Sequence, residues 1–266
     1  MPKLTDVESH FAFGKNWRSY SNLINEDRIS HAEAALHRLV GDLDGKSFID
    51  IGCGSGLHAL AAGRLGASSI TAIDIDQDAV STTTRVLENT VTPHEVLQVS
   101  VFDLPRAWAQ RFDVVYSWGV LHHTGAMYRA LADAADLVKP EGIFAFALYR
   151  KTPLCGFWKI EKRIYSRSPA AIQKAARGLY AAAVAVRLRR SFLARLRRAD
   201  RGMEFWHDVH DWLGGYPYES ISPRQVHAYM QSLNFTLQRE FVTKPGLGLA
   251  GSGCDEYVYA RRGRAA

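Results

Sequence analysis

Short apolar runs alternate with amphipathic segments through the first half of the chain. The apolar runs are rich in Val, Ile and Phe, and they predict strands at residues 47–51, 69–75, 96–101, 112–117 and 142–148. The amphipathic segments predict helices at residues 26–40, 57–65, 76–89 and 126–138. Strands and helices that alternate in this way form a parallel sheet with helices on both faces. The pattern therefore predicts an α/β fold built on a doubly wound, Rossmann-like sheet.

The pattern changes after Leu148 and returns at Ser222. Residues 150–212 are basic and mostly helical in pattern, with aromatic interruptions. Ser222-Pro-Arg-Gln is a good helix start, because it offers an N-cap hydroxyl, a proline in the first turn and a glutamine at the third position. A helix at 223–233 and strands at 235–242 and 256–261 complete the pattern. We expect a domain formed by residues 1–149 and 220–266, with a helical insertion at 150–219 after the fifth strand.

Charge is distributed unevenly. The chain has a net charge of +6, yet residues 150–201 hold 15 Lys or Arg against two acids, a local charge of +13. The rest of the chain therefore carries 6 − 13 = −7. A basic segment on an acidic body indicates a cover over an acceptor site, a contact with an anionic membrane surface, or a contact with nucleic acid phosphates. We also expect a break in this segment near residues 187–190.

Three scattered cysteines, Cys53, Cys155 and Cys254, argue against both a disulfide framework and a metal cluster. They fit a reducing compartment. No apolar run approaches the roughly 18 residues that a membrane span needs. We expect a cytoplasmic protein without a metal site, which could also lie at the inner membrane surface through its basic segment.

Residues 48–56, Phe-Ile-Asp-Ile-Gly-Cys-Gly-Ser-Gly, hold the most informative motif. A buried strand runs through an acid, Asp50, into a loop with glycine at positions 52, 54 and 56. Glycine lets a backbone turn tightly and approach a ligand closely. The spacing differs from the Gly-x-Gly-x-x-Gly of dinucleotide binders. By itself the motif also fits a plain strand–helix turn.

Two further acids follow later strands. Asp74 ends the second strand, where a carboxylate can accept hydrogen bonds from both hydroxyls of a ribose. Asp103 follows the third strand, and together with Phe102 it could hold an adenine; a turn cap explains Asp103 almost as well. Three acids after three successive strands favour a nucleoside site over capping alone.

Residues 48–56, 73–76, 102–103, 112–123 and 137–142 together resemble the class I S-adenosylmethionine-dependent methyltransferases. The resemblance covers residues 40–150, with the last helix and two strands at 222–262. It implies a seven-stranded sheet with an antiparallel last strand and S-adenosylmethionine as cofactor. It further implies a cofactor site made by Asp50, Gly52, Cys53, Gly54, Gly56, Asp74, Ile75, Phe102, Asp103 and Trp118. Asp50 would lie near the methionine part, Asp74 at the ribose, and Phe102 and Asp103 at the adenine. Glu141 stands where many members have glycine.

The exit of the fourth strand and a later cluster hold the candidate catalytic residues. His123 matches a histidine that many small-molecule members carry, and it is the candidate general base; it could instead hold a loop. His122 is the weaker candidate. His207 and Asp211 stand four residues apart, so they share a helix face and could form a base and its orienting partner, or a substrate clamp. A structural network is the alternative for this pair, and a metal site is not expected.

The strand-four motif lacks the pattern of enzymes that methylate nucleobase amino groups, and the paired glutamates of arginine methyltransferases are missing. We therefore expect methylation of a hydroxyl on a small or lipid-linked acceptor such as a quinol, phenol or glycan. The alternative is an RNA-directed methyltransferase that binds phosphates through the basic segment.

Overall fold

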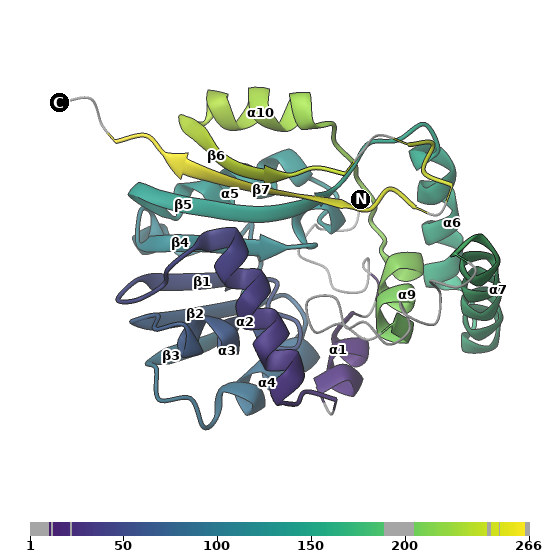
Figure 1. Ribbon diagram of the computed structural model, residues 1–266, viewed down its shortest axis with the longest axis horizontal. Helices are drawn as coiled ribbons and strands as arrows, with labels where there is room; N and C mark the ends of the chain where they lie inside the picture. Colours follow the sequence, from purple (N-terminus) through teal and green to yellow (C-terminus); the bar gives the residue numbers. More distant parts are fainter. Residues whose placement is uncertain are drawn as a thin grey trace.

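The computed structural model describes residues 11, 13–21, 23–188, 205–243, 246–249 and 251–263. Its centre is a seven-stranded sheet in the order β3-β2-β1-β4-β5-β7-β6 (Figure 1). The strands are β1 (Ser47–Ile51), β2 (Ser69–Asp74), β3 (His94–Gln98), β4 (Phe112–Trp118), β5 (Val138–Tyr149), β6 (Phe235–Phe241) and β7 (Cys254–Arg261). The first five strands are parallel, and β7 runs antiparallel to both β5 and β6. The predicted sheet with an antiparallel last strand is confirmed.

Helices cover both faces of the sheet, as a doubly wound fold requires. On one face, α2 (Glu26–Val40) and α3 (Leu57–Arg64) pack with Phe48, Val114 and Val258 of the strands, and α4 (Gln77–Leu87) contributes Leu87 to the same core. On the other face, α5 (Met127–Asp136) and α10 (Pro223–Ser232) pack on a core that includes Phe146 and Tyr257. These two cores fix the sheet whose strand ends carry the site.

Two boundaries were predicted wrongly. The third strand lies at His94–Gln98, earlier than the predicted 96–101. Helix α5 ends at Asp136, and β5 already begins at Val138, four residues before the predicted start. The extra residues of β5 include Glu141, whose backbone has a φ of 64°. That left-handed conformation explains why related sequences place glycine at this position.

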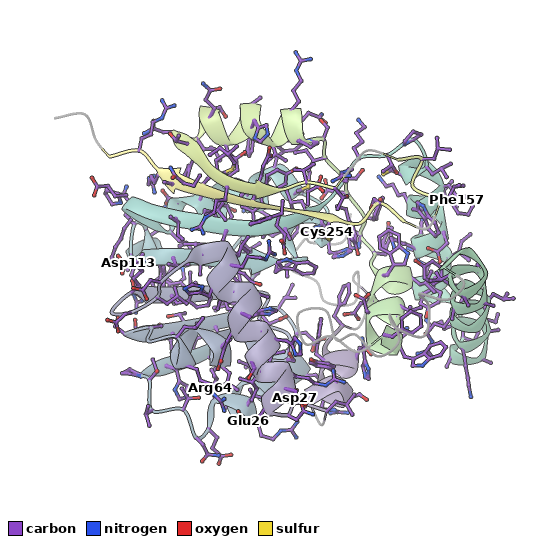
Figure 2. All side chains as sticks on the ribbon, in the orientation of Figure 1. Glu26, Asp27, Arg64, Asp113, Phe157 and Cys254 are labelled. Atoms are coloured by element: carbon purple, nitrogen blue, oxygen red, sulfur yellow. The ribbon has the colours of Figure 1, made fainter. Side chains whose placement is uncertain are left out.

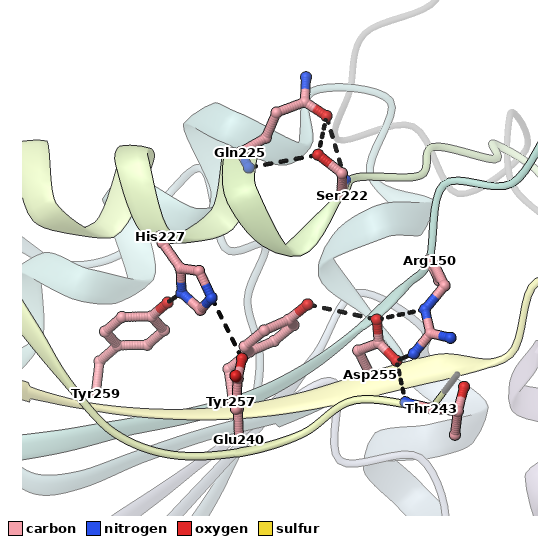
Figure 3. Close-up of polar contacts among 9 residues, drawn as sticks. All are labelled: Arg150, Ser222, Gln225, His227, Glu240, Thr243, Asp255, Tyr257 and Tyr259. Carbon is pink, nitrogen blue, oxygen red and sulfur yellow. Dashed lines mark hydrogen bonds and ion pairs between the residues drawn. The ribbon is translucent and has the colours of Figure 1, made fainter. Parts of the chain in front are cut away.

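Figure 3 shows two sets of polar contacts near β5 and β7, a helix cap and an ion pair. Ser222 and Gln225 form the predicted capping box, in which the Ser222 side chain accepts from the Gln225 backbone and the Gln225 side chain accepts from the Ser222 backbone. Arg150, just after β5, forms a buried ion pair with Asp255 of β7, and its Nε donates to Asp255 Oδ2 at 2.8 Å. The ion pair ties the strand before the insertion to the last strand of the sheet.

The insertion holds α6 (Cys155–Arg167), α7 (Ala170–Leu188) and α9 (Phe205–Gly214), which lie beyond the carboxyl ends of the parallel strands (Figure 1). Helix α1 (Phe13–Ser21) lies beside α9 and packs on α4. The expected break near residues 187–190 reaches outside the described residues. Among the described helices, none combines the length and the apolar content of a membrane span.

Candidate functional site

A cavity of about 1170 Å³ lies at the carboxyl ends of the parallel strands. Its walls come from the loops after β1, β2, β3 and β4, from the ends of β5 and β7, and from α1 and α9. Ligands of open α/β sheets bind at this edge. The cavity therefore lies where the sequence motifs predict a site.

The glycine loop needs its glycines. Gly52, Gly54 and Gly56 have φ values of 77°, 54° and 77°, which side chains rarely adopt. A Cβ on Gly52 would lie 2.4 Å from the Val120 side chain, and a Cβ on Gly54 would lie 3.2 Å from the Trp17 ring. Gly52 and Gly54 line the cavity, whereas Gly56 is the N-cap of α3 and is not among the described lining residues. Two of the three predicted glycines thus present backbone to the cavity.

Asp50 and Asp74 come from the neighbouring strands β1 and β2, and both line the cavity. Burial and then the charge of Asp74 raise the pKa of Asp50 to about 8, and the Asp50 side chain is 3% exposed. Burial also raises the pKa of Asp74 to about 6, although its carboxylate accepts from the backbone nitrogens of Gly54 at 3.1 Å and Asp76 at 3.0 Å. Among the described residues no Lys or Arg forms an ion pair with either carboxyl, so the two suit a ligand that brings an ammonium group and hydroxyl donors.

The remaining predicted cofactor residues divide into two groups. Cys53, Ile75, Phe102 and Trp118 line the cavity. Asp103 is exposed in a turn, where its backbone nitrogen donates to the carbonyl of Ser100 at 2.9 Å, and it is not among the described lining residues. Because β3 ends at Gln98, four residues separate Asp103 from the strand. Its assignment to the adenine stays a prediction.

Trp118 belongs to a polar group that the sequence did not reveal. Its Nε1 donates to Glu256 Oε1 at 2.9 Å, and the other oxygen of Glu256 pairs with Arg38. These three side chains, from β4, β7 and α2, all line the cavity. Nothing in the spacing of positions 38, 118 and 256 could have linked them, because only the sheet order brings β7 beside β5.

His123 lies in a short 3₁₀ turn after β4 and lines the cavity. Its Nδ1 is 2.7 Å from the carbonyl oxygen of Pro217, so in the neutral ring Nδ1 carries the proton and Nε2 can accept one. His122 is fully buried beside it, with its ring centroid 3.9 Å from that of Tyr149 and the two rings tilted by 40°. Burial lowers the pKa of His122 well below its usual value, as does the charge of His123. Of the two histidines, His123 is the one at the cavity.

Helix α9 presents Asp211 to the cavity but not His207. The carboxylate of Asp211 accepts from Asn16 Nδ2 at 2.7 Å, and the same amide donates to the backbone carbonyl of His207 at 3.2 Å. The His207 ring packs on Tyr20 of α1, 5.7 Å between centroids, and is not among the described lining residues. Of the two predicted partners, Asp211 lines the cavity and His207 packs on α1, and their pairing stays a prediction.

Helix α1 closes the cavity, a role that the sequence did not predict. Phe13 and Trp17 line the cavity, and the Phe13 ring lies 5.2 Å from that of His123. The backbone nitrogen of Gly14 donates to Asp76 at 3.0 Å, just beyond Asp74. The aromatic cluster at positions 11–20 was the available signal, but it does not indicate which part of the fold it covers.

Comparisons with known proteins agree with this geometry. Residues 49–146 match the model of a family described as methyltransferase domain. The ubiquinone biosynthesis O-methyltransferase of Neisseria meningitidis serogroup C is 33% identical over 113 residues, which are 42% of this chain and 48% of that protein. The chain thus spans about half the length of this curated relative.

Two solved structures share the fold. A putative S-adenosylmethionine-dependent methyltransferase from Listeria monocytogenes has a TM-score of 0.55 and 13% identity, covering 88% of this chain and 99% of that one. The 1,6-didemethyltoxoflavin-N1-methyltransferase of Burkholderia thailandensis, solved with S-adenosylhomocysteine, has a TM-score of 0.52 and 15% identity, covering 90% and 80%. Residues 49–146 are a methyltransferase domain, and the chain has the class I S-adenosylmethionine-dependent methyltransferase fold.

Proposed function

We propose that this protein transfers the methyl group of S-adenosylmethionine to a hydroxyl oxygen of a small or lipid-linked acceptor. The observation that carries the proposal is that one cavity joins Asp50 and the glycine loop to His123. The family match and the O-methyltransferase relative support the class of reaction. Asp50, Asp74, Gly52 and Gly54 make the donor half of the cavity, and His123 marks its border with the acceptor half.

The donor half fits S-adenosylmethionine, which supplies a methyl group on a positively charged sulfur. Asp50 would hold the ammonium group, since this would supply the cation that its buried carboxylate needs. Asp74 would accept from the ribose hydroxyls, and Phe102 would pack against the adenine, with Asp103 beside it. The left-handed glycines let the backbone approach without a Cβ in the way.

His123 would act as the general base. Its Nδ1–H is fixed by the carbonyl of Pro217, so Nε2 is the nitrogen that can take the proton of the acceptor hydroxyl. A positioned base contributes roughly 10²–10⁴-fold to rate. Residues 150–219, together with α1, would cover the acceptor and exclude water, with Asp211 on the inner side of the cover and His207 holding α9 to α1.

The test uses purified protein, S-adenosylmethionine and a panel of phenols and quinols, with S-adenosylhomocysteine formation as the readout. S-adenosylhomocysteine should bind the wild type, and Asp74→Ala should weaken that binding at least about tenfold. His123→Ala should lower kcat about a hundredfold or more while the affinity for S-adenosylhomocysteine stays within about twofold. Unchanged binding in Asp74→Ala would refute the cofactor placement. Full turnover in His123→Ala would refute the base.

The outer surface of α6 supports delivery of the acceptor from a membrane. Phe157, Ile160 and Ile164 lie on one helix face and are 60–63% exposed, and Phe157 lies on the outer side of the insertion (Figure 2). The exposed cations Lys159 and Arg163 flank them. Apolar side chains beside cations fit an anionic bilayer surface.

Sedimentation with phosphatidylglycerol vesicles tests this part of the proposal. The wild type should bind these vesicles but not phosphatidylcholine vesicles, and Ile160→Asp with Ile164→Asp should release it. Binding to RNA with a steep salt dependence, and not to vesicles, would favour the RNA-directed alternative instead. Arg195, Arg197 and Arg198, which the sequence offers for the same contact, lie outside the described residues.

A further inference from the structure

The acceptor half of the cavity combines aromatic rings with acids. Tyr149 at the end of β5 and Trp212 of α9 meet edge to face, 5.0 Å between centroids, and both line the cavity. Phe13 closes the side towards His123. Asp208 and Asp211 of α9 line the same cavity. Rings and carboxylates therefore surround one space beyond His123.

Asp211 is a carboxyl group to which the part of the chain that the structure describes supplies no cation. Within the described residues its carboxylate accepts from the neutral amide of Asn16, and no Lys or Arg forms an ion pair with it. Burial, and then the charge of Asp208, raise the pKa of Asp211 well above its usual value. Asp211 is half-buried, and an ionised carboxylate that is partly withdrawn from water without a cation is costly, so a cationic ligand group would be favoured there.

The Tyr149 hydroxyl is a second, independent sign of a ligand. Tyr149 is 8% exposed and lines the cavity, and among the described residues its hydroxyl has no hydrogen-bond partner. Buried polar groups are normally hydrogen-bonded. The unused hydroxyl therefore marks a place where a polar group of a ligand would be held.

The nearby lysine already has a partner. Lys162 of α6 is fully buried, its Nζ donates to the backbone carbonyl of Trp212, and it lies 3.5 Å from the centroid of the Trp212 ring. Burial lowers the pKa of Lys162 to about 7, and among the described residues its Nζ forms no ion pair with Asp211. The described residues thus supply no cation to the Asp211 carboxylate, and a ligand in the cavity would supply it.

We propose that the acceptor carries a cationic nitrogen, which Asp211 binds through its carboxylate and the rings of Tyr149 and Trp212 bind through their π faces. Aromatic rings beside a carboxylate are the combination that selects protonated or quaternary amines. A Cβ on Gly215 would lie 2.4 Å from His123 Cε1 and 3.2 Å from the Asp211 carbonyl oxygen, so base and anchor lie close together. The second of these distances concerns the backbone of Asp211, and its side chain lines the same cavity as His123, so one small molecule would place its nitrogen at Asp211 and its hydroxyl at His123. This inference rests on the proposed function.

Three catechols that differ mainly in charge provide the probes: dopamine, 4-ethylcatechol and 3,4-dihydroxyphenylacetate. Their binding to protein saturated with S-adenosylhomocysteine is measured by calorimetry. The cationic probe should bind about tenfold tighter than the neutral one, and the anionic probe should bind most weakly. Asp211→Asn should bring the ratio between cation and neutral probe to about one, while the affinity for S-adenosylhomocysteine stays within about twofold. Tyr149→Phe removes the hydroxyl but keeps the aromatic ring at position 149, and it should lower the affinity for the cationic probe several-fold.

Asp133→Asn is the matched control, because Asp133 pairs with Arg129 on α5 and is not among the described lining residues. It should keep the wild-type preference. Equal affinity of the three probes, no binding of the cationic probe at about 10 mM, or a preference that survives Asp211→Asn would overturn the inference. So would an Asp211→Asn protein that loses S-adenosylhomocysteine, since Asp211 would then belong to the donor half. Failure of the wild type to bind S-adenosylhomocysteine would refute the proposed function itself.

Discussion

The indole ring of Trp17 packs against Gly54, so that a Cβ built on Gly54 would lie 3.2 Å from three atoms of the ring. The conformation of the glycine loop is therefore restricted by its contact with α1 as well as by its own backbone turn. Trp17 comes from α1, and the neighbouring Arg18 pairs with Asp78 of α4 at 3.2 Å. The conformation of the loop depends on how α1 is seated.

Gly54→Ala should weaken S-adenosylhomocysteine binding about tenfold or more and lower the melting temperature, because the methyl group meets both a φ of 54° and the Trp17 ring. Gly45→Ala is the matched control, since Gly45 has a φ of 69° and nothing within 4 Å of its added Cβ. It should lose stability but keep the binding affinity. Equal loss of binding in both variants would show that the close packing of Trp17 is unimportant.

Asp50→Asn should stabilise the ligand-free protein and impair cofactor binding. Burial raises the pKa of Asp50 in the folded protein to about 8 from its usual 3.8, so its contribution to stability is full below about pH 4 and is lost as pH rises to about 8. Asparagine avoids this loss, which amounts to at most about 6 kcal/mol. The gain in melting temperature should therefore be small at about pH 5 and several degrees at about pH 8.

Thermal unfolding at the two pH values and calorimetry with S-adenosylhomocysteine check the Asp50 prediction. The control is Asp42→Asn, since Asp42 lies in the loop before β1 and outside the described lining of the cavity. A gain that is independent of pH, or one that comes with unchanged affinity, would contradict the assignment of Asp50.

Arg150→Met should lower the free energy of unfolding by about 3–5 kcal/mol, because it leaves the Asp255 carboxylate buried without its cation. The free energy of unfolding should fall less in the double variant Arg150→Met, Asp255→Asn than in the single variant. An asparagine can still accept from the backbone nitrogen of Thr243, now 3.3 Å from Asp255 Oδ1 (Figure 3). Urea unfolding of the set gives the coupling energy. Additive losses would mean that the pair does not act as a unit.

Glu141→Gly should raise the free energy of unfolding by up to about 1 kcal/mol, because glycine adopts the φ of 64° without steric cost. Glu88→Gly provides the comparison: Glu88 is also exposed but has a φ of −49°, so glycine should destabilise there by about 0.5–1 kcal/mol. Chemical unfolding measures both. The same sign of change at the two positions would contradict the backbone explanation.

The sequence predicted the parts of the fold that depend on local pattern. The strands around Asp50 and Asp74 are continuous apolar runs, and the glycine loop needs backbone freedom whatever surrounds it. The start of β5 was missed for two reasons. Its first residues continue the helical pattern of α5, and Glu141 occupies a left-handed backbone position at which a glycine would have indicated a turn. Helix α1 was missed because tertiary contacts such as Gly14 with Asp76 hold it.

The candidate site was predicted unevenly for a related reason. His207 and Asp211 share a helix face in sequence, but the rotation of α9 about its axis decides which of them reaches the cavity. That rotation is set by packing on α1 and α6, which no local pattern encodes. Tyr149 and Trp212 look like ordinary core aromatics in the sequence, and only the structure shows that both line the cavity, which is why they are proposed to contact the acceptor.

Helix α1, only nine residues long, contacts the glycine loop through Trp17 and α9 through Asn16. A displacement of this helix would uncover both halves of the cavity at the same moment. On the proposed function, methylated product and spent donor would then depart in one opening event, and the frequency of that event would set an upper limit on turnover. The speed of the enzyme would be governed by a segment outside residues 49–146, and it could be tuned by changes at the surface of α1 that leave the chemistry untouched.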